Sequence, residues 1–202
     1  MRKFIFACLC SISLLANANE TDSNVAEYIV MLNGDTLFGS IEYINYNQST
    51  PKVSKRFKLT APDGKITKIK KNHIRSFRTN GYLYERFYLV KSSSSKSGFL
   101  REEYNIDKNK GVLTFLKVVE KGTLSYYILE TWEQGESLML TYDLLIKNDN
   151  RYFTRVTLGV FGIRKKILHD YINDCKILST KAENKEITSL HEIVIFYNNQ
   201  CQ

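Results

Sequence analysis

The histidines are the first candidates for catalytic or metal-binding chemistry. A glutamate follows His191, as in the helical motif of zinc proteases, but Ile195 occupies the position of the second histidine. This helix therefore cannot give one metal ion two histidines. His169 and Asp170 are neighbours, and neighbours in a helix point about 100° apart, so they do not form one site. His73 lies in a basic stretch, where packing or capping is expected. We predict no metal, no cofactor and no catalytic histidine.

Carboxylates offer a second route to catalysis. The sequence leaves open an enzyme that acts on envelope polymers by carboxylate acid–base chemistry, with residues that only folding would bring together. Its carboxylates would be Asp35, Glu42, Glu85 and Glu102. Phosphate-binding motifs are missing, because KSSSSKSG at 91–98 lacks the glycine–lysine order of a P-loop. We expect that segment to be a flexible polar loop.

Basic residues gather in the first half of the chain. Six of them form the candidate face for an anionic partner: Lys65, Lys68, Lys70, Lys71, Arg75 and Arg78. More cations precede them, namely Lys52, Lys55, Arg56 and Lys58, and four aromatic residues follow, namely Tyr82, Tyr84, Phe87 and Tyr88. A small barrel with cations and nearby aromatic rings is typical of single-stranded nucleic-acid binding. The same charge outside the cell favours anionic lipids, acidic glycans or an acidic protein. The alternative is a solvated strand face whose lysines protect a sheet edge.

The amino terminus has the three zones of a signal peptide. Arg2 and Lys3 precede the apolar run 4–16, and small residues at 16 and 18 predict cleavage between Ala18 and Asn19. The run is shorter than the roughly 20 apolar residues of a membrane-spanning helix. Cleavage removes two cations, so the net charge falls from +8 to +6. We expect an exported protein that is not transmembrane after cleavage and lies in the periplasm, at the outer membrane or outside the cell. Export argues against a nucleic-acid partner.

Cysteine usage agrees with export. Two of the four cysteines leave with the leader, and Cys175 and Cys201 remain. An even pair in an oxidising compartment predicts a disulfide. It would close a loop of about 27 residues and stabilise the fold by about 3.5 kcal/mol in the chain-entropy model. Pairing would also remove both thiols as catalytic candidates.

Turn signals divide the chain after the leader into short strands. Asn33-Gly34 and Asp63-Gly64 predict tight hairpins, and Gly39, inside the strand expected at 36–43, predicts a bulge or a close backbone approach. Other strands are expected at 53–59, 65–70, 82–90, 112–120, 123–132, 138–147 and 151–158. Short strands with frequent turns favour an α+β fold that is mainly antiparallel, as a small barrel or curved sheet.

A pair of helices is expected after the strands. Apolar residues from Ile163 to Ile172 follow helical spacing. Ser189 and Glu192 match a capping box at the start of a second helix. We predict four segments: a signal peptide at 1–18, a polar lead-in at 19–26, a β-rich domain at 27–158 and a helical segment packed on it at 159–202.

Three stretches resemble a family of exported proteins from Bacteroidota. They are YIVMLNGDTLFGSIEY at 28–43, LTFLKVVEKGTLSYYILE at 113–130, and the tail HDYINDCKIL…EIVIFYNNQC that ends at Cys201. The resemblance implies an envelope or secreted protein, and it carries no enzymatic activity with it. Lys176 stands where the resemblance leads us to expect a helix-breaking proline.

The combined features favour a non-enzymatic envelope or secreted protein, in which a basic, aromatic sheet face binds an anionic partner. The sequence leaves open two alternatives to this binding protein: the enzyme described above and a purely structural subunit. The protein contact of such a subunit would use four aromatic residues: Tyr126, Tyr127, Trp132 and Tyr142. The sequence does not identify the partner.

Overall fold

The computed structural model describes residues 26–43, 56–96, 99–132, 139–157 and 162–201. The expected signal peptide, its cleavage site between Ala18 and Asn19, and most of the polar lead-in lie outside these residues. Lys52, Lys55 and the first part of the strand expected at 53–59 lie outside them too. Within the described residues the chain consists mainly of antiparallel strands followed by helices. The predicted α+β class is therefore confirmed.

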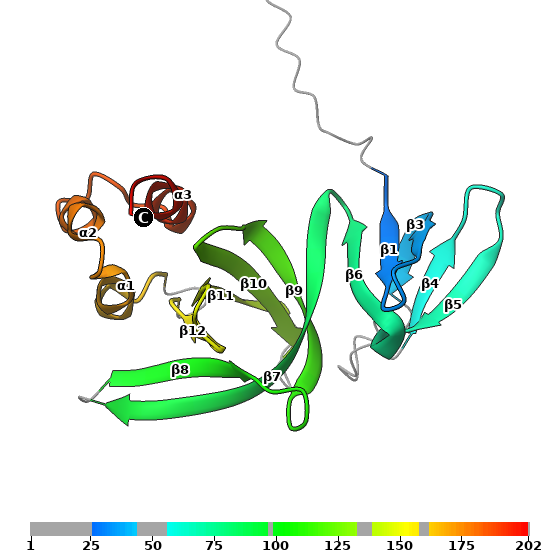
Figure 1. Cartoon of the computed structure of the whole chain (residues 1–202), viewed down its shortest axis with the longest axis horizontal. Coiled ribbons are helices and arrows are strands. Elements are labelled where there is room, and N and C mark those ends of the chain that lie inside the picture. The colour runs from blue at the N-terminus through cyan, green and yellow to red at the C-terminus, as the bar shows by residue number, and fades with distance from the viewer. Residues whose placement is uncertain (1–25, 44–55, 97–98, 133–138, 158–161, 202) are drawn as a thin grey trace, which may run out of the picture.

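Six antiparallel strands close into a barrel (Figure 1). In order around the barrel they are β7 (Tyr82–Lys96), β8 (Phe99–Ile106), β12 (Tyr152–Arg155), β11 (Met139–Lys147), β10 (Leu124–Trp132) and β9 (Val112–Glu120). Pairing of β9 with β7 completes the circle. Side chains alternate across each strand, so Tyr127 and Leu144 point into the barrel whereas Tyr126 and Leu145 point outward.

Strand β7 is long because it belongs to two parts of the molecule. Its first residues pair with β6 (Ile74–Thr79), and its later residues pair with β8 up to Lys96. The prediction of a polar loop at 91–98 is therefore wrong for 91–96. Serines give no apolar signal, but the main chain here is held in a ladder with β8, and Asn105 Nδ2 donates to Ser92 Oγ at 3.0 Å.

A small lobe of two sheets precedes the barrel. In the first sheet β1 (Tyr28–Met31) lies between β2 (Thr36–Phe38) and β6. The second sheet contains β3 (Ser40–Tyr43), β4 (Arg56–Thr60) and β5 (Ile66–Lys70), and the short 3₁₀ helix η1 (Lys71–His73) connects β5 to β6. The two sheets enclose a core of buried side chains: Ile29, Ile41, Phe57, Leu59, Ile69, Ile74 and Phe77. Phe115 of β9 contacts the rings of Phe57 and Phe77, and thereby joins this lobe to the barrel.

Gly39 divides one expected strand into two. Its φ of +148° is strained for other residues, and a Cβ there would lie 2.3 Å from the carbonyl oxygen of Thr60. The prediction of a close backbone approach is confirmed. The chain leaves the first sheet at Phe38 and enters the second sheet at Ser40, so the two halves of the expected strand belong to different sheets.

Glu27 connects the two sheets of the small lobe. Its carboxylate accepts hydrogen bonds from the main-chain N–H groups of Ile41 (2.8 Å) and Asn80 (3.0 Å) and from the hydroxyl of Thr79. Partial burial acts to raise the pKa of Glu27, but these hydrogen bonds outweigh burial and lower it. The ionised carboxylate thus helps to hold β3 beside the β6–β7 turn.

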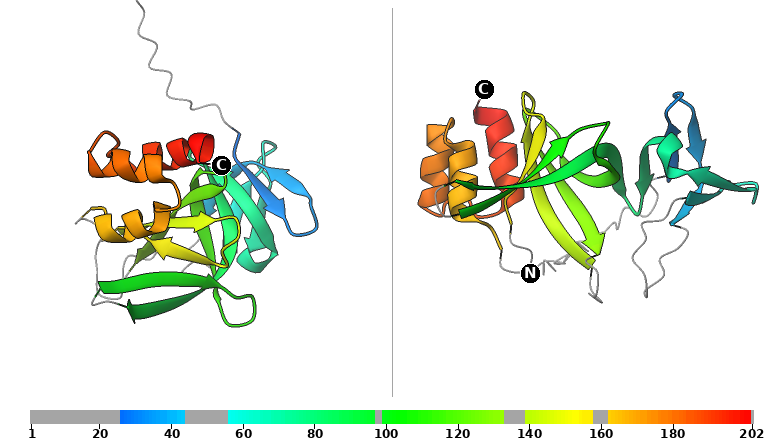
Figure 2. Two further views of the ribbon diagram at one scale, coloured as in Figure 1. Left: turned by 60° about the vertical axis from the view of Figure 1, so that its left-hand side comes forward. Right: turned by 90° about the horizontal axis from the view of Figure 1, so that it is seen from below.

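Three helices cover the outer face of β10 and β11, on the side of the barrel opposite the small lobe (Figure 2). They are α1 (Lys165–Ile172), α2 (Lys176–Glu183) and α3 (Leu190–Gln200). The capping box of Ser189 and Glu192 is confirmed at the start of α3. The expected pair of helices is incomplete, because Lys176 begins an additional helix. α2 has only eight residues and buries only Leu178, so its apolar pattern is too short to stand out in the sequence.

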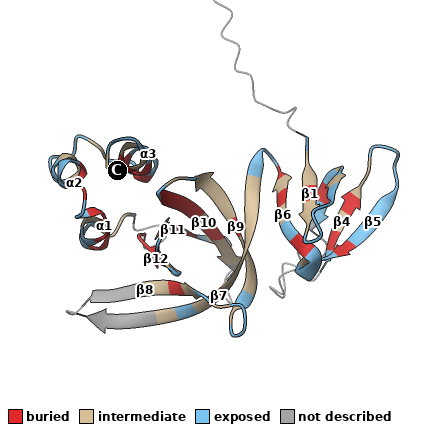
Figure 3. Ribbon diagram, in the orientation of Figure 1, coloured by how far each residue is buried: buried red, intermediate tan, exposed pale blue. Residues whose placement is uncertain are grey.

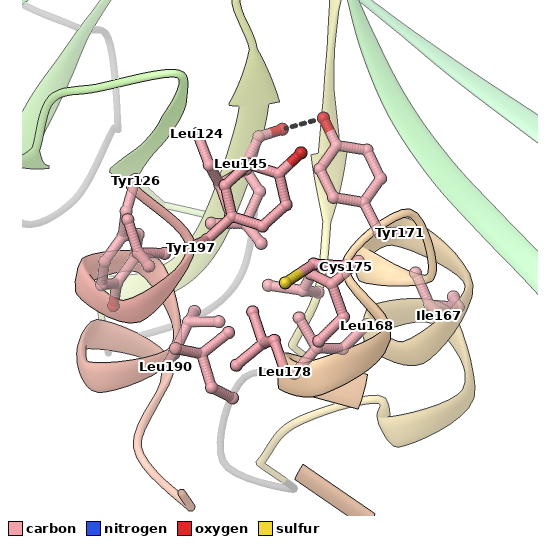
Figure 4. Close-up of a cluster of buried hydrophobic side chains, with 14 residues drawn as sticks. Leu124, Tyr126, Leu145, Ile167, Leu168, Tyr171, Cys175, Leu178, Leu190 and Tyr197 are labelled. Atoms are coloured by element: carbon pink, nitrogen blue, oxygen red, sulfur yellow. Dashed lines mark hydrogen bonds between the residues drawn. The ribbon is translucent and has the colours of Figure 1, made fainter. Parts of the chain in front are cut away.

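Apolar packing fixes the helices to the barrel (Figure 4), and a cross-link joins two of the helices to each other. Tyr171 of α1 donates from its hydroxyl to the carbonyl oxygen of Leu145 at 3.4 Å. Cys175 and Cys201 lie at disulfide distance, with Sγ atoms 2.02 Å apart and Cα atoms 5.5 Å apart. The predicted disulfide pair is therefore confirmed in geometry. It connects the start of α2 to the end of α3.

Asn198 of α3 provides a hydrogen-bond partner for the first residue of β10. Its side-chain oxygen accepts from the N–H of Leu124 at 2.8 Å, and its amide donates to the carbonyl oxygen of Leu124 at 2.9 Å. A Cβ at Gly122 would lie 2.3 Å from this side chain. The lack of a side chain at Gly122 therefore lets α3 approach the β9–β10 turn.

Candidate functional site

The hairpin of β4 and β5 gathers four cations on one surface. Arg56 lies directly opposite Lys70, and Lys58 lies directly opposite Lys68. The intervening positions point the other way, into the core of the small lobe, as the buried side chains of Phe57, Leu59 and Ile69 show. We call the surface formed by Arg56, Lys58, Lys68 and Lys70 the hairpin face.

The hairpin face has an unfavourable arrangement of charge. Side chains directly opposite in an antiparallel pair have Cβ atoms about 5 Å apart, so each of the two cross-strand pairs brings like charges together and destabilises the sheet. Glu42 of β3 relieves part of this repulsion, because it pairs with Lys58, with Nζ and Oε2 2.9 Å apart. Among the described residues, no carboxylate lies within ion-pair distance of Lys68 or Lys70. Solvent reaches most of β5 (Figure 3).

The structure divides the six cations that the sequence grouped together. Lys68 and Lys70 lie on the hairpin face, and Lys65 is exposed immediately before β5. Lys71 lies in η1, where its ammonium donates to the carbonyl oxygen of Leu113 at 3.1 Å and burial lowers its pKa. The last two cations, Arg75 and Arg78, lie on β6.

These two arginines approach main-chain carbonyls and not the hairpin face. Arg75 lies 3.4 Å from the oxygen of Leu32, and Arg78 lies 3.4 Å from that of Gly81. The physical reason is η1, which carries the chain from the sheet of β3, β4 and β5 into the sheet that contains β1, β2 and β6. The prediction of one shared face is therefore corrected: strand alternation places Arg56 and Lys58 beside Lys68 and Lys70 instead.

The aromatic residues that follow the cations are elsewhere. Tyr84 stacks on Phe77 with ring centroids 4.7 Å apart, inside the junction of the lobe and the barrel. Phe87 packs on Phe153 within the barrel. Tyr82 is half exposed, but the ammonium of Lys117 lies 3.2 Å above its ring. The hairpin face is therefore basic without the expected aromatic component.

The four candidate carboxylates each have a polar or charged partner of their own. Asp35 accepts from Asn33 in the β1–β2 turn, and Glu42 pairs with Lys58. Glu85 accepts from Lys121 at 2.8 Å and from the hydroxyl of Tyr127 at 2.7 Å. Glu102 pairs with Arg155. Within the described residues each of the four thus has a hydrogen-bond or ion-pair partner that is not another of the four.

The histidines have carboxylate neighbours of their own. Nε2 of His169 lies 2.9 Å from Glu183, whereas its Nδ1 is 3.9 Å from Asp170. Nε2 of His191 lies 3.3 Å from Glu120 of β9. No group of three or more His, Cys, Asp or Glu side chains in the described ranges is arranged to hold a metal ion.

The aromatic residues proposed for a protein contact are mostly internal. Tyr126 is covered by the helices, and Tyr127 and Tyr142 fill the barrel. The side chain of Trp132 lies outside the described residues. Three of the four rings are therefore unavailable for a surface contact, because β10 and β11 are inner strands covered on both sides.

One buried ion pair had no counterpart in the sequence predictions. Arg155 and Glu102 face each other across β12 and β8 inside the barrel, where both side chains are largely buried. Arg155 also donates to the carbonyl oxygen of Thr157 at 2.7 Å, and its guanidinium lies 3.6 Å from the ring centroid of Tyr142. The pair is thus well satisfied, and we interpret it as part of the core. The sequence does contain a signal for this pair: Arg155 lies two positions after the inward-facing Phe153, so alternation along β12 also points Arg155 into the barrel.

Comparisons with known proteins give no relative for this chain: no protein-family model, curated protein or solved structure matches it. Within the described residues, no helix has the length and apolar character needed to cross a membrane.

Proposed function

We propose that this chain is an exported, non-enzymatic binding protein whose hairpin face holds an anionic partner. The observation that carries the proposal is the pair of like-charged contacts, Arg56 opposite Lys70 and Lys58 opposite Lys68. Such contacts oppose folding. Lys58 already has Glu42 as a partner, but no described carboxylate lies within ion-pair distance of Lys68 or Lys70. A negatively charged partner that reaches these two lysines removes the repulsion, so the unfavourable charge of the free protein becomes favourable in the complex.

Protection of a sheet edge explains only part of this charge. β5 is an edge strand, and lysines at Lys68 and Lys70 are suited to keep other strands from pairing with it. Arg56 and Lys58 lie on β4, the central strand of the three. Both edges of β4 are already paired, so cations there protect nothing. This difference favours a binding role for the face.

Export is supported by two features of the chain. The amino terminus has the layout of a signal peptide, and the cysteine pair suits an oxidising compartment. The resemblance to exported proteins of Bacteroidota points the same way. Mass spectrometry of the protein purified from its native cells tests this part. We expect a chain that begins at Asn19 with no free thiol, and an intact Met1 with free thiols at both Cys175 and Cys201 would overturn it.

Binding to a soluble acidic polysaccharide tests the function itself. Alginate is a suitable probe, measured at about 20 mM and about 500 mM salt, between which the screening length falls from about 20 Å to about 4 Å. We expect binding at low salt and its loss at high salt. The variant K68E/K70E should bind at least tenfold more weakly than the wild type.

The matched control changes the same amount of charge far from the hairpin face. Lys165 and Lys176 are exposed at the starts of α1 and α2, on the other side of the barrel, and acidic residues suit helix starts. The variant K165E/K176E should lose less than about threefold in affinity, from the change in net charge alone. Equal losses in the two variants, or no binding at low salt, would overturn the proposal.

A further inference from the structure

The tip of the β4–β5 hairpin carries an exposed apolar side chain among the cations. Ile66 is 55% exposed. It lies opposite Thr60, two positions before Lys68, so alternation places it on the same side of the sheet as the hairpin face. Pro62 is also exposed in the turn that precedes it. The hairpin therefore presents an apolar tip next to a basic surface.

We infer that the hairpin face binds the surface of an anionic lipid bilayer, with Ile66 entering the boundary between head groups and acyl chains. This inference rests on the proposed function and names its anionic partner. Peripheral membrane proteins bind through the same two terms, apolar side chains buried at the boundary and cations near anionic lipids.

Ile66 distinguishes a bilayer from a soluble polyanion. A linear acidic polymer satisfies Lys68 and Lys70 but has no apolar layer to receive a neighbouring isoleucine. In water, the exposed side chain of Ile66 remains unfavourably hydrated. At a bilayer the tip and the cations are satisfied together, since the boundary lies directly beneath the phosphate groups.

One acidic residue shares the tip. Asp63 lies in the β4–β5 turn, where its Oδ1 accepts from the N–H of Lys65 at 2.9 Å. Its role in shaping the turn explains its presence. The side chain of Lys65 is exposed next to it and offsets its charge. The net charge of the hairpin from Arg56 to Lys70 thus remains strongly positive, with five cations and one carboxylate: Arg56, Lys58, Lys65, Lys68, Lys70 and Asp63.

Cosedimentation with lipid vesicles tests the inference. The chain from Asn19 onward is mixed with vesicles of phosphatidylcholine containing about one third phosphatidylglycerol, or with phosphatidylcholine alone. We expect binding to the anionic vesicles only. Each cation near an anionic surface raises the affinity about fivefold, so K68E/K70E, which removes two cations, should weaken binding by more than about 25-fold. I66S should weaken it about fivefold.

Two variants on the helices serve as controls. K165E/K176E has the same charge as K68E/K70E, and I177S removes an isoleucine that is 62% exposed on α2. Both should bind anionic vesicles within about threefold of the wild type. Circular dichroism confirms that each variant folds.

The possible outcomes distinguish the lipid inference from the proposed function on which it rests. Binding to alginate without binding to anionic vesicles would overturn the lipid inference and leave the proposed function standing. If the protein binds neither alginate nor anionic vesicles, the lipid inference and the proposed function are both overturned. Vesicle binding that is lost in K68E/K70E but unchanged in I66S would also overturn the inference, because the apolar tip would then play no part.

Discussion

Replacing both Cys175 and Cys201 with alanine should destabilise the folded chain by about 3.5 kcal/mol. The cross-link closes a loop of about 27 residues that contains α2 and α3, and the chain-entropy model assigns that free energy to a loop of this length. Alanine is preferred to serine, because Cys175 is buried within the cluster that holds the helices and a hydroxyl there would be unsatisfied. For a chain of this size, the change corresponds to a fall of about 7–14 °C in Tm.

Urea unfolding of the wild type and of C175A/C201A measures the difference. The midpoint of the variant should move to lower urea, and its slope should not fall, since an unfolded chain without the cross-link is less compact. A reducing agent provides the control: it should destabilise the wild type by a similar amount and leave the variant unchanged. A difference below about 1 kcal/mol, or a variant that responds to reduction, would refute the loop argument.

Three further outcomes are expected. Asn198→Ala should lower the free energy of unfolding, measured in urea, by about 2 kcal/mol, because it leaves the buried main-chain groups of Leu124 unpaired. The control Asn199→Ala, at an exposed position, should leave that free energy almost unchanged, and equal effects of the two substitutions would contradict the prediction. The lowered pKa of Glu27 means that its stabilisation is present above its ordinary value of 4.5 and is lost as the pH falls through the lower folded-state value. The free energy of unfolding should therefore depend less on pH in E27Q than in the wild type across that range. An equal pH dependence in the two proteins would argue against the hydrogen bonds of Glu27. Lys70→Glu should raise stability by about 0.5 kcal/mol at low salt, since it replaces a like-charged pair with an opposite pair while it weakens binding; a loss of stability would contradict the repulsion.

Local signals in the sequence predicted the local structure well. The turns at Asn33-Gly34 and Asp63-Gly64 and the capping box at Ser189 each depend on a few adjacent residues. The cysteine pair follows from counting, because only two cysteines lie beyond the predicted signal peptide. These features need no knowledge of distant parts of the chain.

Features that depend on distant partners were missed or only half seen. The serines at 92–95 form strand only because β8 lies beside them. Gly39 signalled a close approach, but the sequence did not reveal that Thr60 is the neighbour or that the chain changes sheets there. Closure of the barrel by β7 and β9 is a long-range pairing with no local signature.

The candidate site shows the same limit. A window of sequence grouped Lys71, Arg75 and Arg78 with Lys68 and Lys70, although η1 separates them in space. The correct grouping follows from the register of β4 on β5, which the turn at Asp63-Gly64 sets. Reading each cation by its alternation from that turn would have found the hairpin face.

Amide chemical shifts measured during titration show directly which residues of the chain contact an anionic partner. The ¹⁵N-labelled chain from Asn19 onward is titrated with short alginate oligomers at low salt. The largest changes should fall in Arg56–Thr60 and Ile66–Lys70 and should disappear when salt is added. Changes concentrated in α1, α2 and α3, with the hairpin unaffected, would contradict the proposed function.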